Sequence, residues 1–271
     1  CARRGYNLFL TDINDCGLNS IKQGLERQYG IKVTVKCCDL TDSQDVDALF
    51  SIIDRHNINF DMLLNIAGID FEGDFISNER ENIVKIVSLN NAATLRITHA
   101  VLERKQKDKP FYIVFVSSLA SMFPMPLKAT YASSKRFLFD FALALREELK
   151  HENTHVLVLC PGGMVTNEKA IAAIDAQGFW GSVTTNPLEK VAFQTVNRVL
   201  NGKSQYIPGG FNRFLSSLGK IVPRRIVAAT VYWRWNTAQK KWLHKVEIRS
   251  PPNHVYFFGR FCEGGFYKSP P

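Results

Sequence analysis

The sequence predicts an α/β fold built on a parallel β-sheet with helices on both faces. Short runs rich in branched and aromatic residues alternate with longer segments of helical periodicity, which is typical of β-α-β units with right-handed crossovers. The run "FYIVFV" at residues 111–116 is apolar throughout, as expected of a strand that is covered on both faces. With 271 residues, 45% of them hydrophobic, the chain can bury a sizeable core.

The individual elements follow from period and composition. Short runs of branched and aromatic residues predict strands at residues 7–11, 32–37, 62–66, 111–116 and 155–160. Helical periodicity predicts helices at residues 17–29, 43–56, 79–104 and 131–150. A further helix, ending at residue 200, is expected to have Asn186 as its cap and Pro187 in its first turn. A last short strand is predicted within residues 202–210.

The opening stretch, "CARRGYNLFLTDIND", is typical of the second strand of a dinucleotide-binding unit. Gly5 starts a turn, a β-rich run follows it, and Asp12 stands at the end of that run. An acid at this place can accept hydrogen bonds from the adenosine ribose of a dinucleotide. Alternatively, Asp12 caps the helix that follows, since Asp is a good N-cap.

Charge and cysteine content narrow the function classes. The formal net charge of +9 belongs to the C-terminal part, because residues 202–249 carry ten basic residues against Glu247 alone. This charge accompanies no nucleic-acid recognition motif, so we expect no nucleic-acid partner. The six cysteines show no metal-ligand spacing, which favours free thiols in a reducing, cytoplasmic compartment and no metal site. The sequence contains no run of about 18 apolar residues, so it predicts no transmembrane helix.

The most informative pattern is Tyr131 and Lys135 in "YASSK". Side chains at positions i and i+4 of a helix share a face. The ammonium of Lys135 is therefore expected to favour the phenolate and to lower the pKa of Tyr131 from about 10. A fall of roughly three units would correspond to about 4 kcal/mol. Such a tyrosine can exchange a proton near neutral pH, as general acid–base catalysis requires.

Other polar and glycine-bearing segments are predicted at the same edge of the sheet. Ser118 follows the strand at 111–116, where its hydroxyl can hold a substrate carbonyl or alcohol. Ligands of parallel sheets bind beside the carboxyl ends of the strands. At the end of the predicted strand 62–66 stand the motif residues Asn65, Ala67 and Gly68. After the predicted strand 155–160 come Pro161, Gly162 and Thr166.

The ordered set "NIAG", "SLNN", Ser118, "YASSK" and "PGGMVT" closely resembles the short-chain dehydrogenase/reductase family. The resemblance covers roughly residues 2–210 and implies a Rossmann-like doubly wound parallel sheet. It also implies an oxidoreductase with a nicotinamide cofactor. Ile66 departs from the pattern, because the family's motif has a second asparagine there.

The resemblance assigns four catalytic residues. Tyr131 would exchange a proton with the reacting oxygen, and Lys135 would bind the nicotinamide ribose and bias the tyrosine toward phenolate. Ser118 would orient the substrate, and Asn90 would hold a water in a proton relay. The nicotinamide carries the hydride, while the protein supplies position and electrostatics. Asn90 could instead be a helix-interior residue that bonds a backbone carbonyl.

The cofactor is expected to be NAD, with NADP less favoured. Asp12 would repel a 2′-phosphate, and the residues directly after it supply no arginine to hold one. Asp39 resembles the family's adenine-contacting aspartate, although it could also cap a helix. The predicted cofactor site comprises Asp12, Asp39, Asn65, Ala67, Gly68, Tyr131, Lys135, Pro161, Gly162 and Thr166.

The family's first strand and glycine-rich phosphate loop are missing from the sequence. The motifs that are present imply that roughly thirty residues of a longer protein supply them ahead of Cys1. The stretch "CARRG" is then expected to be the tail of a helix that Gly5 ends. Without a pyrophosphate cradle, the chain by itself is expected to bind a dinucleotide poorly.

Two parts of the chain are expected. Residues 1–210 form the Rossmann-type domain, and residues 211–271 form a basic, aromatic-rich extension that is helical at first and disordered toward its end. The mixture of aromatic and basic residues in 211–245 suits a peripheral contact with an anionic membrane. A soluble appendage with a solvated basic face is the alternative, and it is slightly favoured.

Several side chains in the "YASSK" region are expected to be structural. Ser117 is interpreted as structural, and Ser133 and Ser134 as ordinary helix-surface residues. The stripe Phe137, Phe141, Ala144 and Leu145 is predicted to serve packing. In the family this helix often packs against a second subunit, so the resemblance implies a homodimer or homotetramer.

Two functions are compatible with the sequence. The first is an NAD-dependent oxidoreductase that acts on a secondary alcohol or ketone, with an apolar, lipid- or sterol-like substrate as one option. Met122, Phe123, Phe179 and Trp180 could line its pocket. The second is a non-catalytic binding or scaffold protein that keeps the fold but has lost the phosphate site.

Overall fold

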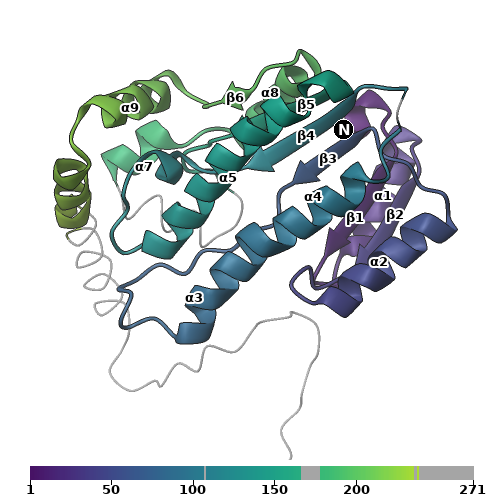
Figure 1. Cartoon of the computed structure of the whole chain (residues 1–271), viewed down its shortest axis with the longest axis horizontal. Coiled ribbons are helices and arrows are strands. Elements are labelled where there is room, and N and C mark those ends of the chain that lie inside the picture. Colours follow the sequence, from purple (N-terminus) through teal and green to yellow (C-terminus); the bar gives the residue numbers. More distant parts are fainter. Residues whose placement is uncertain (107, 166–177, 235–236, 238–271) are drawn as a thin grey trace, which may run out of the picture.

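The computed structural model describes residues 1–106, 108–165, 178–234 and 237 (Figure 1). All strand pairs in this part of the chain are parallel. The strands are β1 (Leu8–Asp12), β2 (Val33–Cys37), β3 (Met62–Asn65), β4 (Phe111–Val116), β5 (Thr154–Leu159) and β6 (Gln205–Tyr206). The five longer ones lie within one residue of their predicted bounds, and β6 falls in the stretch predicted for the last strand.

The strands form two sheets. One sheet has the order β1-β2, starting with Leu8 opposite Val33, and the other has the order β3-β4-β5-β6. The two sheets are neighbours, because the ring of Phe9 in β1 meets the ring of Phe60, just before β3, edge to face at 6.0 Å. No backbone ladder joins β1 to β3 among the described residues. The edges of the two sheets that face this break are β1 and β3.

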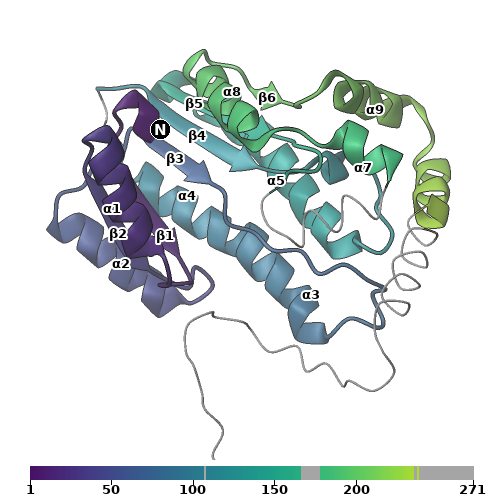
Figure 2. The ribbon, with the colours of Figure 1, turned by 180° about the vertical axis from the view of Figure 1, so that it is seen from behind.

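Helices cover both faces of the sheets, as predicted. On one face lie α2 (Ser43–Arg55), α4 (Thr94–Leu102) and α5 (Ala129–Glu148), and their apolar side chains share a core with β4 and β5 (Figure 1). On the other face lie α1 (Leu18–Tyr29), which packs on β1 and β2, and α8 (Leu188–Leu200), which packs on β4 and β5 (Figure 2).

The local signals for helix ends are mostly confirmed. Gly5 ends the short 3-10 helix Ala2–Arg4 with a left-handed φ of 80°, which glycine adopts without steric cost. Asp42 caps α2, because its carboxylate accepts hydrogen bonds from the backbone N–H groups of Gln44 and Asp45. The predicted cap of α8 is wrong by one residue. Pro187 holds the N-cap position, and the Asn186 amide donates to the Thr184 carbonyl instead.

The C-terminal part described by the structure is helical. The helix α9 (Gly210–Ile221) follows β6, and residues 224–234 form a further helical segment. Both lie at the end of the molecule where α7 (Phe179–Thr184) also packs (Figure 1). No helix among the described residues is long and apolar enough to cross a membrane.

Candidate active site

The predicted catalytic residues come together where β3, β4 and β5 end. Tyr131 lies on the first turn of α5 and Ser118 lies two residues after the end of β4, and both side chains line the same cavity. The Nζ atom of Lys135 lies 5.8 Å from the centre of the Tyr131 ring. It donates a hydrogen bond of 2.9 Å to the carbonyl of Val116 in β4. One helix turn therefore presents both groups to the same end of the sheet.

The expected lowering of the Tyr131 pKa by Lys135 is wrong for this structure. Burial of the phenol raises its pKa above the usual value, and the carboxylate of Asp70 raises it further. The hydroxyl of Ser118 and the charge of Lys128 oppose this rise. Burial also lowers the pKa of Lys135 to about 8, because an ammonium loses hydration in this place. Tyr131 is therefore set to hold its proton.

Asn90 lies in an irregular turn of its helix. The single helix predicted for 79–104 consists of α3 (Arg80–Val87), a π-helical turn (Ser88–Ala93) and α4. Asn90 is completely buried, and its Oδ1 accepts from the Ile69 N–H at 2.9 Å. Its Nδ2 donates to the Ile69 carbonyl and to the Ser134 hydroxyl, both at 3.0 Å. π turns of this kind are frequent at functional sites.

Ser134 is not the helix-surface residue that the sequence predicted. It is buried, accepts the hydrogen bond from Asn90, and donates to the Tyr131 carbonyl at 2.7 Å. Asn91 is buried beside it and donates to the Ser134 carbonyl at 2.9 Å. Ser133 is exposed and Ser117 is a buried donor to the Lys135 carbonyl, so both of these interpretations are confirmed. Ser134 thus ties the π turn to α5.

The "NIAG" segment packs tightly against these groups. Asn65 donates to the hydroxyl of Thr98 in α4 at 3.0 Å, which fixes the end of β3. Ala67 follows, exposed. A Cβ atom on Gly68 would lie 3.1 Å from both Asn90 Oδ1 and Lys135 Nζ, closer than most real contacts. A side chain at position 68 would therefore force Asn90 or Lys135 to move by a few tenths of an ångström.

The two aspartates predicted to bind the adenosine end differ in their surroundings. Asp12 is exposed at the end of β1, and its Oδ1 accepts from the Asn14 N–H at 2.8 Å. It does not cap α1, which begins at Leu18 with Gly17 as the N-cap. Asp39 accepts from the Thr41 hydroxyl at 2.6 Å and from the Thr41 N–H at 2.9 Å. These bonds lower the pKa of Asp39 and hold its turn ahead of α2.

Only part of the predicted segment after β5 lies within the described residues. Pro161 is buried and its carbonyl accepts from the Leu119 N–H at 2.7 Å. A Cβ atom on Gly162 would overlap the carbonyl oxygen of Thr184 and approach Asn212 Nδ2 to 2.9 Å. Gly162 therefore permits α7 and α9 to pack against the end of β5. Thr166 lies outside the described residues.

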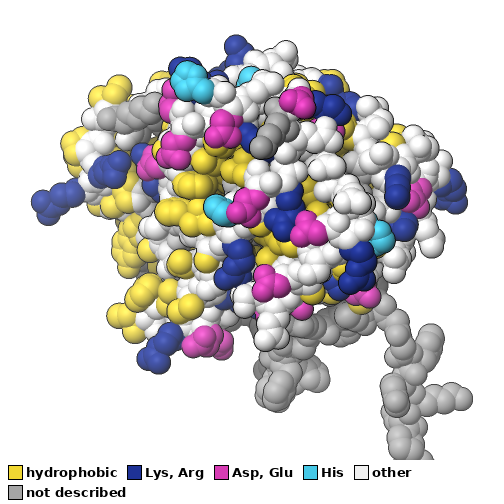
Figure 3. Space-filling view, turned by 45° about the vertical axis from the view of Figure 1, so that its right-hand side comes forward, with side chains coloured by type: hydrophobic (Ala, Val, Ile, Leu, Met, Phe, Trp, Pro, Cys, Tyr) yellow, Lys and Arg dark blue, Asp and Glu magenta, His cyan; other side chains and the backbone are white. Residues whose placement is uncertain are grey.

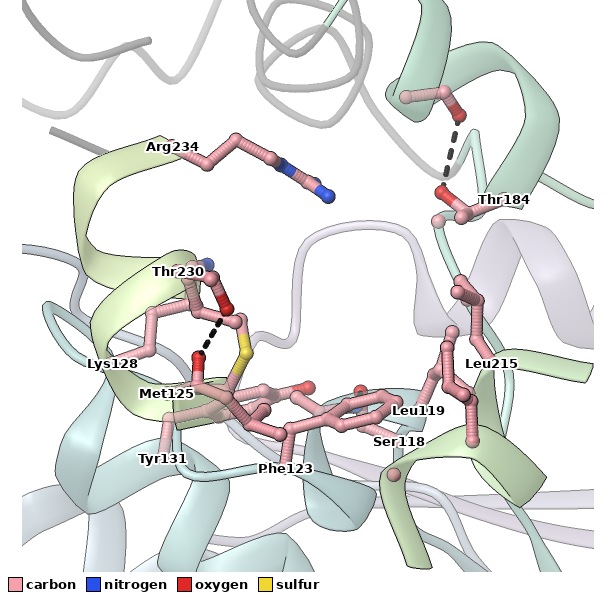
Figure 4. Close-up of a pocket in the computed structure, with 18 of the residues that line it drawn as sticks. Ser118, Leu119, Phe123, Met125, Lys128, Tyr131, Thr184, Leu215, Thr230 and Arg234 are labelled. Carbon is pink, nitrogen blue, oxygen red and sulfur yellow. Dashed lines mark hydrogen bonds between the residues drawn. The ribbon is translucent and has the colours of Figure 1, made fainter. Parts of the chain in front are cut away.

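A cavity of about 470 Å³ opens beside Tyr131 and Ser118 (Figure 4). This volume falls in the range of roughly 300–1,000 Å³ that is typical of small-molecule sites. Its walls are mainly apolar, and nine of the lining residues come from α9 and residues 222–234. Phe123 lines it as predicted, whereas Met122 packs against the core. The side chains of Phe179 and Trp180 lie outside the described part of the structure.

Next to the tyrosine lies a partly exposed charge cluster that the sequence did not predict. The ammonium of Lys128 lies 2.5 Å from a carboxylate oxygen of Asp70 and 2.9 Å from one of Glu72. Lys128 also sits 5.7 Å from the centre of the Tyr131 ring. Lys128 is the N-cap residue of α5, three residues before the tyrosine, and this spacing was the available signal. No signal in the sequence pointed to Asp70, because it contacts Lys128 across 58 residues of sequence.

The described residues fit the two ends of a dinucleotide. Lys135 and Tyr131 stand beside the unsubstituted backbone of Gly68, where a nicotinamide ribose can be held. Asp12 presents an exposed carboxylate at the end of a parallel strand, which suits the other ribose. The described residues between these ends contain no turn with the three-glycine pattern of a pyrophosphate cradle.

Comparison with known proteins agrees with this geometry. A family model for short chain dehydrogenases matches residues 1–174. A very-long-chain 3-oxoacyl-CoA reductase of Laccaria bicolor is 31% identical over 159 residues, which make up 57% of this chain and 46% of that relative. A 3-oxoacyl-[acyl-carrier-protein] reductase of Mycobacterium avium is 25% identical over 66% of each chain. The chain spans about half the length of the first curated relatives that it matches.

Solved structures show the same fold. A short-chain dehydrogenase from Sphingobium yanoikuyae, in complex with NADPH, has a TM-score of 0.69 at 20% identity, covering 95% of this chain and 92% of its own. A 7β-hydroxysteroid dehydrogenase has a TM-score of 0.74 at 14% identity, covering 85% and 88%. A 4-hydroxyisoleucine dehydrogenase complexed with NADH scores 0.63 at 19% identity, covering 77% and 89%.

The family model covers well over half of the 271 residues. It matches a chain with parallel strands, helices on both faces, and a serine, tyrosine and lysine grouped where the strands end. The chain belongs to the short-chain dehydrogenase family.

Proposed function

We propose that this chain is the main part of an NAD-dependent oxidoreductase that interconverts a secondary alcohol and a ketone on an apolar molecule. The observation that carries the proposal is that Ser118 and Tyr131 line one end of an apolar cavity together, with Lys135 on the same helix face as Tyr131. The relatives named above are reductases and dehydrogenases, which agrees with this class of reaction.

The four residues have separate tasks in the proposed reaction. A bound nicotinamide supplies or accepts the hydride. Ser118 holds the reacting oxygen and Tyr131 exchanges a proton with it, protonating the alkoxide that forms during ketone reduction. Lys135 binds the nicotinamide ribose and places a positive charge near the phenol. In the reduction direction the raised pKa of Tyr131 suits the chemistry, because the phenol must start protonated.

Asn90 acts in this proposal by position. Both ends of its amide already have protein partners, so its side chain fixes the loop at Ile69 against Ser134 and α5. A relay water, which the family resemblance implies, would then bond a backbone carbonyl of the π turn. Asn90 stays a predicted catalytic residue on this basis.

The preference for NAD over NADP is part of the proposal. It is supported by the exposed carboxylate of Asp12 and by the residues after it, Ile13, Asn14 and Asp15, none of which is basic. We also propose that a further parallel strand and its phosphate loop complete the sheet between β1 and β3. In dinucleotide-binding folds with strand order 3-2-1-4-5-6, the break between these strands falls where the first strand lies.

The experiment is a coenzyme comparison in the longest natural protein that contains this chain. Apolar ketones are reduced with NADH or NADPH, in wild type and in Asp12→Ser. We expect wild type to favour NADH, and Asp12→Ser to lose roughly tenfold or more of this preference, since two hydrogen bonds to a charged group and one repulsion disappear. A wild type that favours NADPH would refute the NAD assignment. Lack of turnover together with lack of coenzyme binding would favour the scaffold alternative.

Oligomerisation and location are proposals as well. Phe137 is 43% exposed on α5 and stacks on Phe141 at 5.9 Å, which leaves an apolar stripe for a second copy in a dimer or tetramer. A monomeric mass by light scattering would contradict this.

Hydrophobic side chains also gather at the end that carries α9 (left in Figure 3), among them Phe214 and Trp233. We propose a cytoplasmic protein that touches anionic membranes there, and absent vesicle binding would refute the contact.

A further inference from the structure

Three charged side chains, Asp70, Glu72 and Lys128, form a cluster beside Tyr131. The ammonium of Lys128 lies 2.5 Å from a carboxylate oxygen of Asp70 and 2.9 Å from one of Glu72. Lys128, Tyr131 and Ser118 line the same cavity (Figure 4), and Asp70 lines it as well. The side chains of Lys128 and Asp70 are 17% and 26% exposed, so solvent screens their charges only in part.

The two segments that carry this cluster are also tied through their backbones. Asp70 and Glu72 lie in the loop after β3, and Lys128 is the N-cap residue of α5. The N–H of Gly73 donates to the carbonyl of Leu127 at 2.8 Å. Leu127 has a left-handed φ of 64°, a conformation that is unfavourable for leucine and that clusters at functional sites. The loop after β3 is therefore held against the start of α5 by hydrogen bonding and by charge.

Two ammonium groups stand near the ring of Tyr131. The Nζ atom of Lys128 lies 5.7 Å from the ring centre and that of Lys135 lies 5.8 Å from it. Positive charges at such distances favour a phenolate. The pKa of Tyr131 is nevertheless raised, first by burial and then by the carboxylate of Asp70. Asp70 therefore acts on the phenol in the opposite sense to the lysines.

We infer that Asp70 and Lys128 are positioning residues of this site, whose ion pair holds a carboxylate beside the phenol of Tyr131 and so opposes the nearby ammonium groups that favour phenolate. Asp70 supplies the negative charge, while Lys128 fixes it in place and reduces its effect. The effect of this charge on the phenol does not depend on the proposed function. Its use in ketone reduction, where the phenol must start protonated, rests on the proposed function.

The described ionisable groups beside the phenol come from three parts of the chain. The loop after β3 supplies Asp70 and Glu72, and α5 supplies Lys128 and Lys135. Arg234, from the helical segment 224–234, lines the same cavity. The formal charges of the two carboxylates and the two lysines cancel. Loss of the Asp70 charge leaves a positive excess and loss of the Lys128 charge leaves a negative one, so the two changes should move the acidity of the phenol in opposite directions.

The test is a titration of the phenol at position 131 in the longest natural protein that contains this chain, without coenzyme. A ring-fluorinated tyrosine is incorporated at this position alone, because fluorine makes the phenol more acidic and gives one fluorine NMR signal that reports its ionisation. The variants are Asp70→Asn and Lys128→Met. Asp74→Asn is the matched control, since it removes the same charge from an exposed residue of the same loop that does not line the cavity.

We expect Asp70→Asn to lower the pKa of this phenol by about one unit, which is roughly tenfold in its ionisation constant, and Lys128→Met to raise it by a similar amount. Asp74→Asn should leave it nearly unchanged, because solvent and salt screen an exposed charge. Asp70→Glu, which keeps the carboxylate, should retain most of the wild-type value. Lys135 is the same in all variants, so its own titration cancels in the comparison.

Three results would overturn the inference: an unchanged pKa in Asp70→Asn, shifts of the same sign in Asp70→Asn and Lys128→Met, or a shift in Asp74→Asn as large as that in Asp70→Asn. Circular dichroism over the pH range verifies folding, and Asp70→Ser takes the place of Asp70→Asn if the latter does not fold. A brace that only held the loop would change stability without these opposite shifts.

The rate of ketone reduction with NADH is then followed against pH in the same variants without the fluorinated residue. The loss of rate at high pH, where the phenol loses its proton, should begin at lower pH in Asp70→Asn than in the wild type. An unchanged profile would overturn the use of the charge in reduction. Absence of turnover in the wild type, together with the expected shifts in the titration, would refute the oxidoreductase proposal alone.

Discussion

At the scale of single residues, Gly68 shows most directly how the backbone serves the site. A Cβ atom there would press on Lys135 Nζ and Asn90 Oδ1, both at 3.1 Å. Gly68→Ala is therefore expected to displace the lysine and to weaken coenzyme binding and turnover by about tenfold or more, since a misplaced catalytic group is costly. Gly24→Ala in α1 is the control, because its Cβ meets nothing within 4 Å.

The effect of the control substitution Gly24→Ala on stability can also be predicted. Replacing a glycine inside a helix by alanine is expected to stabilise the protein by roughly 0.5–1 kcal/mol. Thermal unfolding and coenzyme titration of both variants provide the comparison. If Gly68→Ala bound coenzyme as tightly as Gly24→Ala, the close approach of backbone and lysine would have no functional meaning.

Lys135 gives a prediction about pH. Burial lowers the pKa of Lys135 from 10.5 to about 8, so between these values the unfolded chain binds the additional proton. The free energy of unfolding contributed by this group must therefore rise with pH from about 8 to about 10.5, and below about 8 the full cost of the buried ammonium remains. The rise is at most about 3 kcal/mol.

Urea denaturation over this pH range, in wild type and Lys135→Met, measures the effect. The difference in unfolding free energy between the two proteins should increase in favour of the wild type as the pH rises, because the variant has no ammonium to neutralise. Parallel curves would mean that the lysine is hydrated in the folded protein and that its pKa is ordinary.

At the scale of elements, the π turn is tied to α5 through Ser134. This serine is buried and bonds both Asn90 and the Tyr131 carbonyl, whereas its neighbour Ser133 is exposed. Ser134→Ala is expected to cost about 1–2 kcal/mol of unfolding free energy, because a buried amide donor of Asn90 loses its partner. Ser133→Ala should change stability by less than about 0.5 kcal/mol. Chemical denaturation measures the unfolding free energy of both variants. Equal losses would contradict the role of Ser134 in holding the π turn to α5.

Local patterns in the sequence predicted the elements well, and long-range contacts were beyond them. The apolar run of β4 and the spacing of Tyr131 and Lys135 are local, and both lie where they were expected. The π turn could not be predicted from the sequence, because it depends on hydrogen bonds of Asn90 with Ile69 and Ser134, which are distant in sequence. The direction of the Tyr131 pKa shift failed for a related reason. It depends on burial and on Asp70, neither of which the helix spacing reveals.

At the scale of the whole molecule, the site is shared among distant parts of the chain. The ends of β3, β4 and β5 supply the polar groups, while α9 and residues 222–234 close the apolar side of the cavity. The C-terminal region, which the sequence indicated mainly through its charge, thus forms part of the cavity wall. In the part of the chain that the structure describes, no ladder joins β1 to β3, and we propose that the further strand and phosphate loop complete the coenzyme site at this break.

The most direct test of the central claim is the Tyr131→Phe variant of the longest natural protein that contains this chain. NADH oxidation with apolar ketones and calorimetric titration with NAD are measured on the same preparations. We expect the variant to lose turnover by at least about a hundredfold, as for the loss of a general acid, while coenzyme affinity changes little. Turnover equal to that of the wild type would contradict the account, because Tyr131 would then not be the proton donor.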